Sequence, residues 1–121
     1  MNDPKYFGKY RGIALNNVDP MQIGRLLVQV PDVAGLFPSN WALPCFPIAG
    51  KQMGAYMIPP QIGAGVWVEF EQGDPDYPIW SGCWCGSAAE VPRLVLAGSP
   101  ASPNIVLQSS LQNAILLHKH E

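Results

Sequence analysis

Along several short stretches of the chain, apolar and polar residues alternate with a period of two. This alternation is typical of strands buried on one face, because successive side chains of a strand point to opposite sides. Five strands are predicted on this basis: Tyr10–Leu15, Ile23–Val30, Gly54–Ile58, Gly65–Glu71 and Tyr77–Trp84. The clearest core faces are Leu26, Val28 and Val30 in the second strand and Val66, Val68 and Phe70 in the fourth.

The long connection Asp32–Gly50 is rich in proline and aromatic residues and has no period of its own. A connection of this length is unusual unless it is packed or functional, so we expect Trp41, Leu43 and Phe46 to hold it against the strands. Five strands with one such connection favour a small closed Greek-key barrel, which removes exposed strand edges.

After Gly86 the pattern changes to small residues and prolines, with a brief strand predicted at Leu94–Leu96. Two further strands are predicted at Ile105–Gln108 and Ala114–His118. The expected organisation is a barrel domain over 1–86, a linker over 87–103 and a stranded C-terminal segment over 104–121. No long helix is expected, because no helical-period apolar stripe survives the prolines and glycines.

The composition points to a chain that is covered by partners. Of its 121 residues, 48% are hydrophobic and only 13% are charged, whereas soluble domains have about 25% charged residues. The net charge of −2 offers no basic stripe for phosphate binding. The N-terminus lacks the apolar core of a signal peptide, and no run approaches the ~20 apolar residues that span a bilayer.

The three cysteines, Cys45, Cys83 and Cys85, are an odd number and cannot form a complete disulfide framework. We expect buried free thiols and synthesis in a reducing compartment such as the bacterial cytoplasm.

The stretch from Lys9 to Gly86 resembles the OB domain of central spike proteins from phage baseplates and of VgrG-type spikes from type VI secretion and related injection systems. The matching segments are KYRGIALNNVDPMQIGRLLVQVPDV, WALPC and AYMIPPQIGAGVWVEFEQGDPDYPIWSGCW. The most specific part, Gly65–Gly82, is a tryptophan-containing strand with an acidic end, a Gly-Asp-Pro-Asp turn and Pro-Ile-Trp-Ser-Gly.

This resemblance implies an all-β protein: a five-stranded OB-fold barrel followed by a short segment that trimerises into a β-prism or β-helix-like needle. It implies a structural role in the baseplate of a virion or extracellular injection particle, beneath a hub protein, with the target cell envelope as a transient contact. The chain departs from larger relatives because it lacks a lysozyme-like insertion and a long glycine-rich repeat. The needle is therefore short or completed by a separate PAAR-like tip protein.

The C-terminal strands supply apolar area that a single hairpin cannot shield, so we expect a homotrimer formed through them. The expected interface residues are Ile105, Leu107, Ala114, Ile115, Leu116 and Leu117. Trp67 and Trp80 lie opposite the apolar faces in the predicted strands. Two interpretations stay open: both are exposed for an interface, or both pack under the Asp32–Gly50 connection.

His118 and His120 are the candidate metal ligands. A strand places both imidazoles on one side, and three copies around a threefold axis offer six nitrogens, a set that suits one iron or another first-row ion per trimer. Some phage spikes are similar, with a His-x-His motif near the apex. The alternative is an ordinary charged chain end.

No enzyme is expected, and no catalytic residue is assigned. The carboxylates Glu69, Glu71, Asp74 and Asp76 resemble the solvated end of a strand and its turn, without the cleft that glycoside hydrolysis needs. The rival functions are an OB module for single-stranded nucleic acid, which the charge disfavours, and a cell-wall hydrolase fragment, for which the sequence offers no site.

Overall fold

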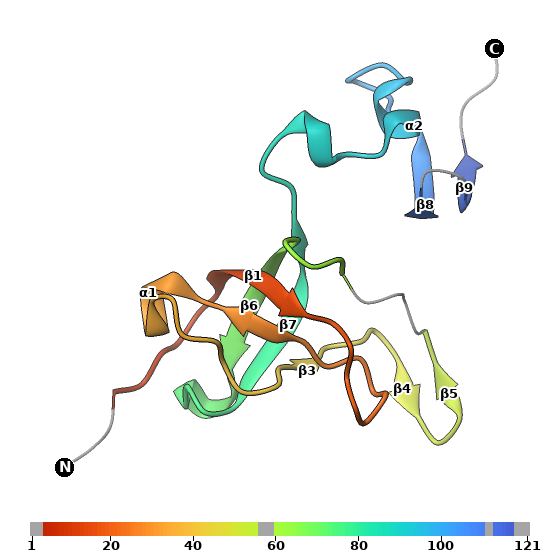
Figure 1. Ribbon diagram of the computed structural model, residues 1–121. Helices are drawn as coiled ribbons and strands as arrows, with labels where there is room; N and C mark the ends of the chain where they lie inside the picture. Colours follow the sequence, from red (N-terminus) through yellow and green to blue (C-terminus); the bar gives the residue numbers. More distant parts are fainter. Residues whose placement is uncertain (1–3, 56–59, 111–112, 118–121) are drawn as a thin grey trace. The chain divides into compact units, whose positions relative to one another are not determined.

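The computed structural model describes residues 4–55, 60–110 and 113–117. The contacts divide the chain into two compact units, Met1–Trp84 and Cys85–Glu121. Strands dominate the first unit, and the second contains short helical turns followed by a β-hairpin (Figure 1).

Within the described residues of the first unit, five strands form one sheet in the order β2-β1-β6-β7-β3. β3 runs parallel to β7, and the other neighbours are antiparallel. The strands are β1 (Tyr10–Asn16), β2 (Leu27–Gln29), β3 (Leu43–Pro44), β6 (Gly65–Phe70) and β7 (Pro78–Trp84).

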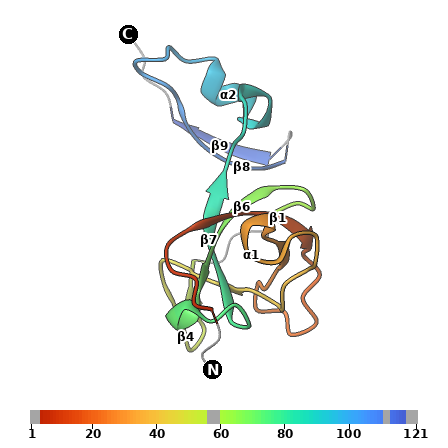
Figure 2. The same ribbon diagram turned by 90° about the vertical axis from the view of Figure 1, so that its left-hand side faces the viewer.

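The two edges of this sheet meet across Leu26 and Ala42. These residues form an antiparallel bridge in which Leu26 N donates to Ala42 O at 3.1 Å and Ala42 N donates to Leu26 O at 2.7 Å. Because Leu26 precedes β2 and Ala42 precedes β3, the bridge joins the outer strands into a curled, barrel-like sheet (Figure 2). This arrangement agrees with the predicted all-β OB fold, a five-stranded and partly open barrel.

The core lies inside the curled sheet, as the alternation predicted. The two expected core faces are buried, and they pack with Ala14, Ala42 and Trp80. Burying such side chains contributes about 1.5–3 kcal/mol each to folding. The largest fully buried side chains are branched aliphatic ones from β6 and from the segment around β2: Leu26, Val28, Val66 and Val68. These contacts fix which face of each strand points inward.

The described residues of the third predicted strand, Gly54–Ile58, do not belong to this sheet. The described part of Gly54–Ile58 contributes only β5 (Met53–Gly54), which pairs with β4 (Ala49–Gly50) in a separate hairpin, and residues 56–58 lie outside the described residues. The fifth place is taken by β3, from the connection that was expected to be irregular. That connection also contains the short helix α1 (Pro31–Ala34).

Trp80 is the residue that holds this connection in place. Its ring meets Phe46 edge-on at 6.4 Å, and its backbone oxygen accepts a hydrogen bond from Cys45 N at 2.9 Å. Leu43, in contrast, is exposed. In β3, which pairs with β7, its side chain points to solvent. Phe46 therefore packs the connection as predicted, and Leu43 does not.

Trp80 itself is buried, so the expectation that it faces outward is wrong. Trp80 pairs with Val68, and residues directly opposite in an antiparallel pair lie on the same face of the sheet. A bulge between Val66 and Val68 then shifts the register, with Gly82 at φ 135°. Beyond the bulge Trp84 pairs with Gly65, so Trp80 and Trp84 are on opposite faces. Without the bulge, two residues four apart in a strand would share a face.

The prediction of buried thiols is also wrong. Cys45, Cys83 and Cys85 are exposed. Cys83 lies after the bulge, and Cys85 follows the last residue of β7, where the core no longer covers the chain.

The second unit contains two short helical turns, η2 (Ala88–Glu90) and α2 (Arg93–Leu96), and then β8 (Ile105–Ser110) and β9 (Asn113–Leu117). The brief strand predicted at Leu94–Leu96 is therefore wrong. Pro92 starts a helical turn there, because proline is favoured at a helix beginning, where no intrahelical amide donor is needed. The two terminal strands are confirmed as an antiparallel pair, with His118 outside the described residues.

Trp80 is buried and Trp67 is half-buried, although the sequence pattern treated the two residues alike. This difference can be tested. Trp80→Ala removes a buried indole and is expected to lower the free energy of unfolding by about 3–5 kcal/mol. Trp67→Ala removes a half-buried ring and is expected to cost less. Urea unfolding followed by far-ultraviolet circular dichroism measures both; equal losses would contradict the buried position of Trp80.

Candidate assembly surface

The β8–β9 hairpin carries an exposed apolar face. Its register pairs Ile105 with Leu117 and Leu107 with Ile115, so these four side chains share one side of the hairpin. Their exposed fractions are 65% for Ile105, 62% for Leu107, 64% for Ile115 and 61% for Leu117. Four large aliphatic side chains in one row are far more apolar surface than a two-stranded hairpin normally leaves in water.

The opposite face of the hairpin is different. It carries Val106 paired with Leu116 and Gln108 paired with Ala114. Val106 and Leu116 are half-buried, and α2 contacts β8. Asn104, just before β8, donates from Nδ2 to Leu94 O of α2 at 2.7 Å. The six residues expected at a trimer interface are thus divided between an open face and a partly covered one.

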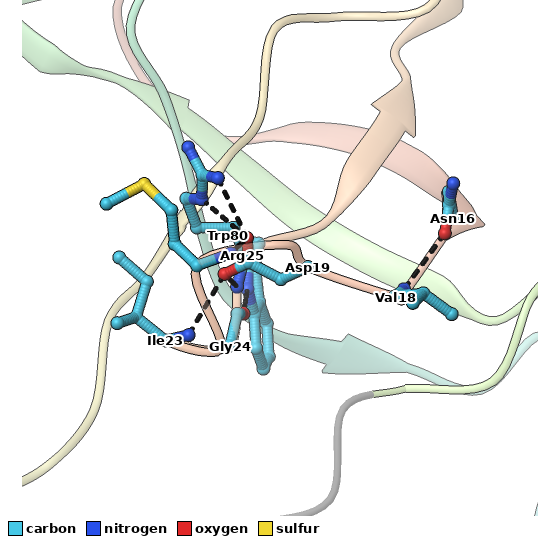
Figure 3. A network of polar contacts seen from close by, with 8 residues as sticks. Asn16, Val18, Asp19, Ile23, Gly24, Arg25 and Trp80 are labelled. Carbon is cyan, nitrogen blue, oxygen red and sulfur yellow. Dashed lines mark hydrogen bonds and ion pairs between the residues drawn. The ribbon is translucent and has the colours of Figure 1, made fainter.

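In the barrel unit, a buried carboxylate organises the loop between β1 and β2 (Figure 3). Asp19 Oδ1 accepts hydrogen bonds from Met21 N, at 3.0 Å, and from Arg25 Nε and Nη2, at 2.9 and 2.8 Å. Asp19 Oδ2 accepts from Ile23 N at 3.0 Å and from Arg25 N at 3.1 Å. One side chain therefore fixes the path of the whole loop.

The Arg25 side chain and the backbone amides that donate to Asp19 explain why this carboxylate is ionised. The two-pronged guanidinium contact, followed by the backbone donors, holds the pKa of Asp19 well below its ordinary value. The Arg25 guanidinium also lies over the Trp41 ring at 5.3 Å. Trp80 Nε1 donates to Gly24 O at 2.9 Å, which ties the same loop to the core.

This network was missed from the sequence, where Asp19 was only part of a turn. The available signal was an Asp-Pro pair followed within six residues by glycine and arginine. Aspartate in such a turn is known to accept hydrogen bonds from backbone amides that follow it. The carboxylate is saturated with donors, so it shapes the loop and has no free lone pair for acid–base chemistry.

Outside the barrel, Arg11 lies between two indole rings. Its guanidinium carbon is 5.5 Å from the Trp67 ring centre and 5.1 Å from that of Trp84. A Cβ at Gly65 would come within 2.5 Å of the Trp84 ring, so glycine is required for this packing. Trp67 is half-buried, and its ring contacts Arg11 and Trp84.

The acidic residues considered as catalytic candidates lie at the end of β6 and in the turn that follows it. Glu69 lies 3.8 Å from Lys9 in an exposed ion pair, and Glu71, Asp74 and Asp76 lie at the following turn. Among residues 4–55, 60–110 and 113–117, no group of three or more histidine, cysteine or acidic side chains could hold a metal ion. His118 and His120 lie outside the described residues, so their metal site stays a prediction.

Within the part of the chain that the structure describes, no helix has the length and apolar character needed to cross a bilayer.

These features define a class: a small OB-type β-barrel followed in the chain by a hairpin with an exposed apolar face. A family model described as the type VI secretion system/phage-baseplate injector OB domain matches residues 10–84. The match begins at the first residue of β1 and ends at the last residue of β7. The chain belongs to this family. A comparison with curated proteins gives no significant match.

Membership of this family confirms the resemblance identified in the sequence and indicates a general role. The family is a structural domain of injector baseplates, so the chain is a structural component of a virion or injection particle and associates with baseplate components. The alternative of a nucleic-acid-binding module is not favoured, and the net charge of −2 is unsuited to it.

The Asp19 network predicts a specific dependence of stability on pH. Because folding lowers the pKa of Asp19, its contribution is complete above the unfolded value of about 3.9 and is lost as the pH falls through the folded value. Asp19→Asn is therefore expected to be less stable than the wild type at pH 7, and the difference should shrink in strong acid.

Urea unfolding between pH 7 and pH 2 measures this difference. Asp32→Asn is the matched control, because Asp32 is exposed on α1, and a surface change of this kind is expected to stay within about 0.5 kcal/mol. A gap between Asp19→Asn and the wild type that did not vary with pH would argue against the ionised carboxylate as its cause.

Proposed function

We propose that the chain is the central spike subunit of a contractile injector: a homotrimer that lies below the baseplate hub and pierces the target envelope. The observation that carries this proposal is the open face of the β8–β9 hairpin, formed by Ile105, Leu107, Ile115 and Leu117. The family supplies the baseplate setting, and the hairpin supplies the reason for self-association.

Energetics supports association through this face. Each of the four side chains gains about 1.5–3 kcal/mol if it is fully removed from water. A two-stranded hairpin is at best marginally stable in isolation, and three or more strands with a shared apolar face are needed. Three hairpins packed around an axis bury the open faces together, and closed cyclic symmetry leaves no face uncovered.

Mechanical function follows from such a trimer. A contracting sheath supplies the work, and the spike must transmit it without bending. A barrel whose sheet edges are joined resists deformation because displacement of one strand breaks many hydrogen bonds at once. The proposed partners are a hub protein above the barrels and a separate PAAR-like tip protein below the hairpins.

The metal proposal is kept separate from the trimer. His118 and His120 from three chains would give an imidazole-rich set of ligands, which suits iron or a similar first-row ion. Elemental analysis after metal-replete expression tests it: about one ion per three chains supports the site, and its absence removes it.

The trimer proposal makes a direct prediction for Leu107→Lys. A charge in the centre of the open face would have to be buried without a partner, so the trimer is expected to dissociate to single chains at micromolar concentration. Sedimentation equilibrium or native mass spectrometry measures the mass.

Ile62→Lys is the matched control, since Ile62 lies in the barrel unit and its exposed fraction of 67% is close to the 62% of Leu107. It should keep the mass of the wild type. A wild-type protein that is monomeric at micromolar concentration would overturn the proposal.

A further inference from the structure

A second apolar surface lies at one end of the barrel. β6 ends and β7 begins at this end, since Phe70 pairs with Pro78. A hollow of about 180 Å³ opens here between α1 and the turn that precedes β7. Its apolar lining includes Val30, Val33, Phe37, Phe70 and Pro75, and Ser39, Asn40 and Asp76 add polar groups. Val30 and Phe70 are core residues, so the floor of the hollow reaches the core of the barrel.

Phe37 lines this hollow and Leu36 precedes it in the chain, and these are two of the most exposed apolar side chains of the barrel unit. Leu36 is 84% exposed and Phe37 is 77% exposed. The turn that carries them is fixed by hydrogen bonds: Phe37 N donates to Ala34 O at 3.1 Å, and Gln29 Nε2 donates to Leu36 O at 3.1 Å. The turn is therefore organised before any partner arrives, which lowers the entropy cost of binding.

The size of the hollow indicates what it can accept. Small-molecule sites usually enclose about 300–1,000 Å³. A hollow of about 180 Å³ is instead suited to one large apolar side chain, of the size of leucine or phenylalanine. A pocket for one anchor side chain beside a rigid apolar rim is typical of protein–protein docking.

The charged residues around the hollow indicate which kind of partner it can bind. Asp76 lines it, Asp32 lies on α1, and Glu71 and Asp74 lie in the turn that supplies Pro75. Among the described cations near this end, Lys9 pairs with Glu69, and Lys5 lies beside Gly73. The surroundings are acidic on balance, so an apolar anchor flanked by lysine or arginine is complementary to them.

We propose that this end of the barrel is a docking surface for a partner protein, which inserts one leucine- or phenylalanine-sized side chain and places basic residues beside it. The surface belongs to the barrel unit and does not involve the β8–β9 hairpin. It therefore goes beyond the proposed trimer, and the two can fail independently.

The test uses the full-length protein and three acetylated, amidated tetrapeptides as probes. The first is lysine-leucine-phenylalanine-lysine; the second replaces both lysines with glutamate; the third replaces the leucine and the phenylalanine with serine. Amide shifts in nitrogen–proton correlation spectra measure binding. The first peptide should shift the amides of Val33, Phe37 and Phe70, and the other two should leave them unchanged.

Variants assign the interaction to the surface. Phe37→Ser and Asp76→Lys are each expected to weaken the first peptide at least about tenfold. Val18→Ser, which removes an exposed apolar side chain from the Asp19 loop, should bind as the wild type does. Phe37→Ser should retain the oligomeric mass of the wild type, which separates this proposal from the trimer.

Three outcomes would overturn the proposal. The first is the absence of shifts around the hollow at millimolar peptide, and the second is equal binding of the acidic peptide. The third is a set of shifts at these amides that depends on protein concentration alone and vanishes in Phe37→Ser, which would make a second copy of the chain the occupant.

Discussion

The pairing of β6 with β7 is the contact on which the rest of the barrel depends. Its register places Trp80 opposite Val68 and therefore inside the sheet. From there the indole donates to Gly24 O in the β1–β2 loop and packs against Phe46 in the long connection. One side chain thus links two segments that are far apart in the sequence to the same core. The bulge in β7 has a second effect, because it sends Trp84 to the outer face, where it stacks with Arg11 and covers Gly65.

The buried polar network of this barrel determines the path of the loop between β1 and β2. Asp19 is a buried carboxylate whose two oxygens accept five hydrogen bonds, and Arg25 compensates its charge. The loop that results is rigid without a strand or a helix of its own. A charge that is fully paired in this way has little left to offer to a substrate, which agrees with the structural character of the baseplate family.

Two surfaces of the chain combine exposed apolar side chains with a backbone that is already ordered. The open face of the hairpin and the end of the barrel around Phe37 both expose large side chains on segments held by hydrogen bonds. Only 13% of the residues are charged. Much of the surface is therefore suited to contact with protein, and few charges cause repulsion between copies. The proposed trimer would use the first surface, and the proposed docking partner would use the second.

The sequence by itself determined the all-β class, the family, the inward faces of the strands around Val28 and Val68, and the C-terminal hairpin with its apolar residues. These follow from period-two alternation and from local turns, which are properties of neighbouring residues. The tertiary structure alone decided the pairing of β3 with β7, the inward position of Trp80, the exposure of the cysteines and the network around Asp19. Each of these depends on which strand pairs with which and on a one-residue bulge, and a shift of one residue exchanges the two faces of a strand. Local sequence carries no record of such a shift, because it is set by partners tens of residues away.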